Sequence, residues 1–140
     1  MPEHNPLQRR ALQLAIAIGG LVPVGAGLAG VVFGPDMIPD TPHLSNDLDS
    51  HWRYLSGLLM AIGLGFWSTI PAIAQNGARF RMLAGLVVIG GIARVVSLLV
   101  AGTPAAPMMF ALAMELVVTP ALALWQYNIA DPQPIADTQS

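Results

Sequence analysis

Two residues of opposite charge lie inside long apolar stretches of the sequence, Arg94 in the stretch 85–102 and Glu115 in the stretch 108–126. An arginine near the middle of a membrane helix costs about 2.5 to 3.5 kcal/mol on insertion scales, and an ionised carboxylate should cost a similar amount. Opposite charges are tolerated more readily in a membrane when they meet. The pair could therefore hold two membrane helices together, or Glu115 could transfer protons beside a bound substrate.

The spacing of these two residues predicts that they lie at the same depth. Arg94 precedes Gly102 by eight residues and Glu115 follows Pro107 by eight, so the two charges flank one short turn at equal distances. At a rise of about 1.5 Å per residue, each lies roughly 12 Å from the same membrane face. Small residues are frequent among their helical neighbours, and small residues let membrane helices approach closely. We therefore expect both charges to face the protein interior as a buried ion pair.

Four further polar residues are candidate partners inside the membrane. Arg53 could pair with Asp49, four residues earlier, or turn inward toward Glu115, which approaches from the same membrane face. Three hydroxyl-bearing residues are interpreted as hydrogen-bonding groups between helices. They are Ser56, Ser97 and Thr119.

No catalytic residue and no metal site are predicted. A nucleophile–base arrangement cannot be named, because the chain has no cysteine and no histidine deep inside a predicted helix. Histidines and aspartates in and beside the acidic stretch 34–50 do not follow a known metal-ligand spacing, so a solvated loop is favoured there. The residues considered were His43, Asp47, Asp49 and His51.

The composition is typical of a membrane protein and excludes several function classes. Of the 140 residues, 54% are hydrophobic and only 10% are charged, and a soluble chain of this size could not bury that much apolar surface. The formal net charge of -2 provides no basic surface for nucleic acid. The absence of cysteine excludes disulfides and thiolate-bound metal clusters. No cofactor is predicted.

The apolar stretches predict an all-α integral membrane protein, a bundle of four transmembrane helices at about 11–33, 51–74, 81–101 and 108–127. These form one domain, 11–127, between an N-terminal segment, 1–10, and a flexible tail, 128–140. A cleaved signal peptide is the competing interpretation of 11–33, but this stretch exceeds the ~7–15 residues of a signal-peptide core. A ladder of small residues every four positions predicts a packing face on the first helix. It comprises Ala15, Gly19, Pro23 and Gly27.

The arginines predict the orientation. Arg9, Arg10, Arg79 and Arg81 fall on one side of the membrane if all four helices span it, and the positive-inside rule assigns that side to the cytoplasm. We therefore expect both termini to lie in the cytoplasm. Arg53 is the one basic residue outside this pattern.

A series of residues between 49 and 126 resembles a family of small bacterial membrane proteins, domain of unknown function 4345. The resemblance is carried by Arg-Tyr-Leu-Ser-Gly at 53–57, Ile-Pro at 70–71, Gly-Gly at 90–91, Arg94, Ser97, Glu-Leu at 115–116, Pro120 and Trp-Gln at 125–126. It implies a four-helix inner-membrane protein whose pattern includes Arg94 and Glu115, and it implies no particular activity. A looser similarity in layout to DoxX-like proteins, some linked to quinone-dependent oxidation, is an analogy of fold only.

Two classes of function fit these features. The favoured one is a non-enzymatic bundle that binds a lipid or small hydrophobic ligand, or serves as a subunit of a membrane complex or a homo-oligomer, with Arg94 and Glu115 holding the helices in register. The alternative is a quinone-linked or lipid-modifying enzyme, or a redox accessory subunit, that uses Glu115. The non-enzymatic class is preferred because the rest of a catalytic apparatus is missing.

Overall fold

Every regular element is a helix in the residues that the structure, a computed structural model, describes, which are 6–38, 42 and 45–130. Four helical segments are long and apolar enough to cross a membrane. They are Pro6–Met37, Asn46–Ala72, Gly77–Ala101 and Ala106–Ile129. The prediction of an all-α protein with four membrane-spanning helices is confirmed. Two compact units divide the chain, one of residues 11–71 and one that contains residues 72–130.

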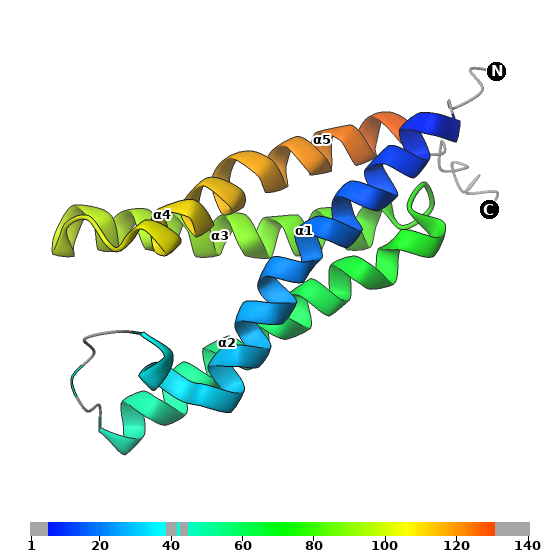
Figure 1. The fold of residues 1–140 in the computed structure, drawn as a ribbon. Coiled ribbons are helices and arrows are strands. Elements are labelled where there is room, and N and C mark those ends of the chain that lie inside the picture. The colour runs from blue at the N-terminus through cyan, green and yellow to red at the C-terminus, as the bar shows by residue number, and fades with distance from the viewer. Residues whose placement is uncertain (1–5, 39–41, 43–44, 131–140) are drawn as a thin grey trace, which may run out of the picture. The chain divides into compact units, whose positions relative to one another are not determined.

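The first unit is a helical hairpin. Helix α1 (Pro6–Phe33) is followed by a short 3₁₀ turn, η1 (Gly34–Met37), and α2 (Asn46–Thr69) returns beside α1 and ends in η2 (Ile70–Ala72) (Figure 1). Helix α2 begins five residues before the predicted start at 51, because Ser45 caps it: the Ser45 hydroxyl accepts a hydrogen bond from the Leu48 amide at 3.3 Å. Asp47 and Asp49 in the first turn add favourable charge at the positive end of the helix dipole.

Glycines set the close approach of α1 and α2. A Cβ atom at Gly27 would lie 2.6 Å from the backbone nitrogen of Met60, and Cβ atoms at Gly20 and Gly30 would collide with Trp67 and Ser56. Gly19, in contrast, has no atom within 4 Å of its Cβ position. Within this hairpin the predicted ladder meets α2 at Pro23 and Gly27 but not at Gly19, and the contact with α2 also uses Gly20 and Gly30.

Two side-chain hydrogen bonds join the other end of the same hairpin. Gln13 Nε2 donates to the Ile70 carbonyl at 2.7 Å, and Trp67 Nε1 donates to the Ala17 carbonyl at 3.1 Å. Both carbonyls belong to helical turns, so each bond adds a polar contact between apolar helix surfaces. The two helices are thus fastened by glycine contacts along their length and by polar side chains near one end.

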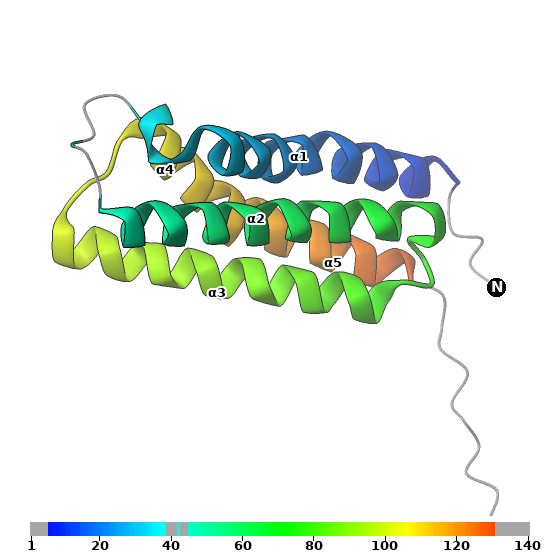
Figure 2. The same ribbon diagram turned by 90° about the horizontal axis from the view of Figure 1, so that it is seen from below.

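The second unit is also a hairpin, but its returning segment is not a uniform α-helix. Helix α3 (Gly77–Ala101) ends at Gly102, whose φ of +91° suits a glycine at a helix C-terminus. The chain returns through α4 (Ala106–Ala113), the π-helical turn η3 (Met114–Val118) and α5 (Thr119–Ile129), which follow one another in one continuous helical segment (Figure 2). The helices extend beyond the predicted bounds, from 77 instead of 81 and to 129 instead of 127.

The π-helical turn accompanies a proline. Pro120 has no backbone N–H, so its position in the helix lacks one hydrogen bond. The Thr119 amide bonds to the Met114 carbonyl, five residues back, and the Thr119 hydroxyl donates to the same carbonyl at 2.9 Å. Single π-helical turns are often found at functional sites. Here the turn carries Glu115.

Large apolar side chains cover much of the accessible surface of both units. Leu99 and Val100 at the end of α3 are 79% and 83% exposed, and Leu14 and Ile18 on α1 are also exposed. A soluble protein rarely leaves such a continuous apolar surface in water. The exposed apolar surface agrees with helices that contact lipid.

Candidate functional site

Arg94 and Glu115 lie next to each other across the second hairpin. Arg94 Nε donates a hydrogen bond to Glu115 Oε1 at 3.1 Å and lies 3.0 Å from Oε2. Arg94 lies seven residues before the end of α3, and Glu115 is the second residue of η3. Both carboxylate oxygens therefore face one nitrogen of the guanidinium group.

Gly91 brings the two helices close enough for this contact. It lies three residues before Arg94, on the same face of α3. A Cβ atom at Gly91 would lie 2.6 Å from Leu116 Cδ2 and 3.1 Å from Glu115 Cβ, so only a glycine leaves room for η3 here. Neighbouring Gly90 has no atom within 4 Å of its Cβ position. The close packing is thus specific to one of the two adjacent glycines.

The ion pair leaves hydrogen-bonding capacity on both partners. Glu115 Oε2 is buried and accepts no hydrogen bond within the described part of the chain. On Arg94, Nη1 approaches only the sulfur of Met108, at 3.3 Å, and a thioether is a weak acceptor. No oxygen atom of residues 6–38, 42 or 45–130 accepts a hydrogen bond from Nη1 or Nη2. The side chain of Arg94 is 38% exposed and that of Glu115 is 15% exposed.

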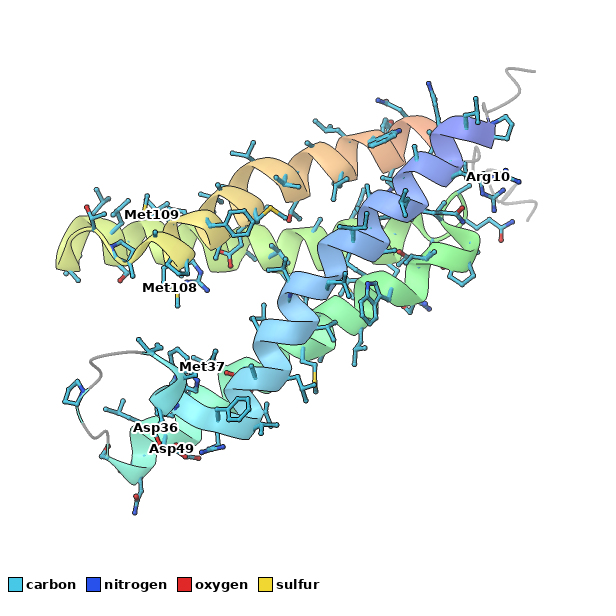
Figure 3. All side chains as sticks on the ribbon, viewed as in Figure 1. Arg10, Asp36, Met37, Asp49, Met108 and Met109 are labelled. Atoms are coloured by element: carbon cyan, nitrogen blue, oxygen red, sulfur yellow. The ribbon has the colours of Figure 1, made fainter. Side chains whose placement is uncertain are left out.

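A crevice of about 210 Å³ lies beside Arg94, between α3 and α4. Its walls are Arg94, Ser97, Leu98, Pro104, Met108 and Leu112. Arg94 and Ser97 are the polar residues of this lining, and the other four residues are apolar. Met108 and Met109 project from different sides of α4, and of these two only Met108 borders the crevice (Figure 3). Glu115 does not line it.

Arg53 pairs with Asp49, the candidate partner within its own hairpin. Its Nε donates to Asp49 Oδ2 at 2.8 Å and its Nη2 donates to Oδ1 at 3.2 Å. Nη1 donates to the carbonyls of Val31 and Val32, at 2.6 and 3.1 Å, at the end of α1. Asp36, Met37 and Asp49 gather at this end of the hairpin (Figure 3). Arg53 thus joins the start of α2 to the last carbonyls of α1, where a cation also favours the helix dipole.

The three hydroxyl-bearing candidates have different surroundings. Ser56 lies against Gly30 at the α1–α2 contact, and Ser97 lines the crevice. Thr119 donates its hydrogen bond to Met114 within its own helical segment instead of to another helix. Ser56 thus belongs to the first hairpin, and Ser97 and Thr119 belong to the second.

The sequence did not predict the contacts of two further residues in the second hairpin, Met108 and Gln126. Met108 contacts the guanidinium group and borders the crevice, and its sulfur had no distinguishing signal among seven methionines. Gln126 is fully buried and its Nε2 donates to the Ile73 carbonyl at 3.0 Å. A lone glutamine near the end of an apolar stretch was the available signal for this second residue.

Among the described residues, no group of three or more His, Cys, Asp or Glu side chains could hold a metal ion. His51 lies beside Tyr54, with ring centroids 6.4 Å apart. His43, which was weighed as a ligand, lies outside the residues that the structure describes.

Comparison with known protein families gives one match. A family model described as Domain of unknown function (DUF4345) matches residues 11–126. The chain belongs to the DUF4345 family. The DUF4345 match begins in α1 and ends in α5, so it includes Arg94, Glu115 and every residue of the crevice. The comparisons with curated proteins and with solved structures gave no match.

Proposed function

We propose that this DUF4345 protein is a non-enzymatic inner-membrane protein that binds a lipid or another small hydrophobic molecule at the crevice between α3 and α4. The observation that supports this function is the crevice itself, which presents unsatisfied Arg94 donors within an otherwise apolar lining. Ligand sites commonly combine apolar walls with a few polar groups that fix orientation. The crevice has this composition.

The size of the crevice favours part of an amphiphile over a whole enclosed molecule. Its volume of about 210 Å³ is below the ~300–1,000 Å³ of sites that enclose a drug-sized ligand. A polar group with a few carbons fits such a space, while the rest of the molecule extends along the exposed apolar side chains.

The Arg94–Glu115 pair has a supporting role in this proposal. Glu115 holds the guanidinium group through Nε and couples α3 to η3. Removing one member of a desolvated pair leaves an uncompensated charge, which is more costly than replacing both members. The pair therefore holds the second hairpin in register and orients the donors of Arg94.

The orientation in the membrane belongs to the same proposal. Arg9, Arg10, Arg79 and Arg81 favour the cytoplasmic side, which places both termini in the cytoplasm. The crevice borders Pro104, in the turn between α3 and α4, and this turn then faces the opposite side of the inner membrane. A ligand would enter from that half of the bilayer.

One observation favours an enzymatic alternative. Glu115 Oε2 is buried, lies 3.0 Å from Arg94 Nε and accepts no hydrogen bond in the described residues, which is an arrangement that a proton-transfer group could have. Glu115 nevertheless does not line the crevice, and Arg94 is the one ionisable residue in the lining. The binding function is therefore preferred over a quinone-linked or lipid-modifying enzyme.

The test compares bound molecules in two matched variants. Ser97→Leu fills the crevice from α3, and Val96→Leu makes a similar apolar enlargement at an adjacent position whose side chain is 56% exposed. Each protein is released from native membranes directly into a mass spectrometer, and co-purifying lipids, quinones and polypeptides are identified.

We expect the parent and Val96→Leu to carry the same small molecule and Ser97→Leu to lose most of it. A parent that carries no small molecule, or equal retention by all three proteins, contradicts binding at the crevice. A stoichiometric polypeptide without a small molecule supports a membrane-complex subunit instead.

A further inference from the structure

Building on the proposed binding function, we propose that the group held by Arg94 is an uncharged carbonyl of an amphiphile, such as an ester or a quinone, and that Glu115 sets this preference by balancing the arginine charge. The inference concerns the chemistry of the ligand, which the existence of the crevice alone does not determine. Three features of the second hairpin support it.

The first feature is the free edge of the guanidinium group. Arginine presents five N–H donors in a planar fork. Glu115 occupies Nε, and Nη1 meets only the sulfur of Met108. The Nη1–Nη2 edge thus retains donors without an oxygen acceptor in the described residues, and Arg94 belongs to the crevice lining. A ligand oxygen would satisfy donors that the protein leaves unpaired.

The second feature is the charge balance of the hairpin around the crevice. With Glu115 ionised, Arg94 and Glu115 form a pair with no net charge, and Arg94 is the one ionisable residue in the crevice lining. An anionic ligand would give three charges with a net charge of minus one, whereas a carbonyl oxygen would accept hydrogen bonds without adding charge. Desolvated charges are tolerated when they are paired, so the existing pair favours the uncharged acceptor.

The third feature is depth. The 25 residues of α3 span about 37 Å, which exceeds the ~30 Å thickness of the hydrocarbon core of a bilayer. Arg94 precedes Ala101, the last residue of α3, by seven residues, or about 10 Å of helix rise. A centred α3 would therefore place Arg94 roughly 7 Å inside the hydrocarbon boundary. Lipid phosphates lie outside that boundary, whereas quinone rings and ester carbonyls can reach this depth.

The experiment measures binding of three probes with alkyl chains of about ten carbons to the full-length protein in nanodiscs of uncharged lipid. Methyl decanoate carries an uncharged ester, a benzoquinone with a decyl tail carries an uncharged ring, and decanesulfonate carries a permanent anion. We expect one or both uncharged probes to bind the parent at least tenfold more tightly than decanesulfonate. The ester and quinone arms distinguish the two sources of the carbonyl.

Two variants separate the roles of the charged residues. Arg94→Lys keeps the positive charge but loses the planar fork, and we expect it to bind the uncharged probes at least fivefold more weakly. Glu115→Gln keeps the size of the side chain but removes the balancing charge. We expect it to bind decanesulfonate at least tenfold more tightly than the parent does, which a purely structural role for Glu115 would not produce. Each variant is measured below its own unfolding temperature.

The outcomes distinguish this inference from the function on which it rests. Tighter binding of decanesulfonate than of both uncharged probes by the parent would overturn the carbonyl preference while leaving the crevice as a ligand site. Equal affinities of the parent and Glu115→Gln for decanesulfonate would overturn charge balancing. If Ser97→Leu left the binding of every probe unchanged, this result would instead refute the crevice as the site.

Discussion

Replacing Gly91 by alanine should drive α3 away from η3, whereas the same change at Gly90 should not. The new methyl group at Gly91 would lie 2.6 Å from Leu116 Cδ2 and 3.1 Å from Glu115 Cβ, well inside the ~3.5–4.0 Å of an ordinary carbon contact. The Leu116 methyl can rotate away, but Glu115 Cβ is fixed to the backbone of η3. The π-helical turn must therefore move by several tenths of an ångström.

The expected magnitude follows from two opposing terms. Overpacking of this kind costs about 1–3 kcal/mol, and alanine is favoured over glycine inside a helix by about 0.5–1 kcal/mol. Gly90→Ala gains the second term without the first, because nothing lies within 4 Å of its Cβ position. The difference between the two variants isolates the steric term, which we expect to be about 1–3 kcal/mol in favour of Gly90→Ala.

The assay is the free energy of unfolding of each variant in detergent micelles, measured by denaturant titration with helix content as the signal. Gly91→Ala should be less stable than Gly90→Ala by the amount given above, and its retention of a crevice-bound molecule should fall as well. Equal stabilities of the two alanine variants would refute the close contact between Gly91 and η3. They would also remove the reason for the short Arg94–Glu115 distance.

Three further experiments test other parts of the account. Arg94→Leu and Glu115→Leu should each lower stability by an amount between the ~0–1 kcal/mol of exposed ion pairs and the ~3–5 kcal/mol of buried ones, because Arg94 is partly exposed. In thermal unfolding, the double variant should lose less stability than the two single variants lose together. A loss equal to their sum would show that the two residues are not coupled. Arg53→Gln should lower the unfolding temperature of the protein by releasing the end of α1, by less at high salt, since this pair is exposed to solvent. An effect that is equal at low and high salt would show that the charge of Arg53 is unimportant. Reporter fusions after Arg81 and at the C-terminus should both indicate the cytoplasm, and a periplasmic C-terminus would contradict the orientation.

The sequence was sufficient to predict the four spans because length and hydropathy nearly determine them. A backbone in lipid must satisfy its own hydrogen bonds, so each long apolar stretch must be helical. Arg94 and Glu115 were also accessible from the sequence, since charges within apolar stretches are rare and their depths can be calculated from the helix rise. Their functional role stays a prediction.

The contacts of the individual residues were less accessible. Gly19 and Gly20 are equivalent in the sequence, and only the bulk of Trp67 on the facing helix shows that Gly20 is the contact residue. Likewise, Gly90 and Gly91 differ only in what η3 places beside them. Glycine carries no hydrophobic signal of its own, so the partner helix decides which glycine is used.

Backbone irregularities and capping account for the remaining differences. Pro120 has no backbone N–H, so the sequence indicates one missing helical hydrogen bond there. The π-helical turn that accompanies Pro120 and the hydrogen bond from the Thr119 hydroxyl to the Met114 carbonyl depend on the local geometry of the backbone. The early start of α2 depends on Ser45, one polar residue among several that could have capped a helix. The crevice was not predictable, because it arises where α3 and α4 separate beside Arg94.

The most direct test of ligand binding at Arg94 is photolabelling in nanodiscs with a decanoate methyl ester that carries a diazirine, followed by peptide mapping. Binding at the crevice predicts labels on Leu98, Met108 and Leu112 that disappear when unlabelled methyl decanoate competes and when Ser97 is replaced by leucine. Labels spread over exposed apolar residues such as Leu99, with no effect of competitor or of the Ser97→Leu change, would contradict a ligand site beside Arg94.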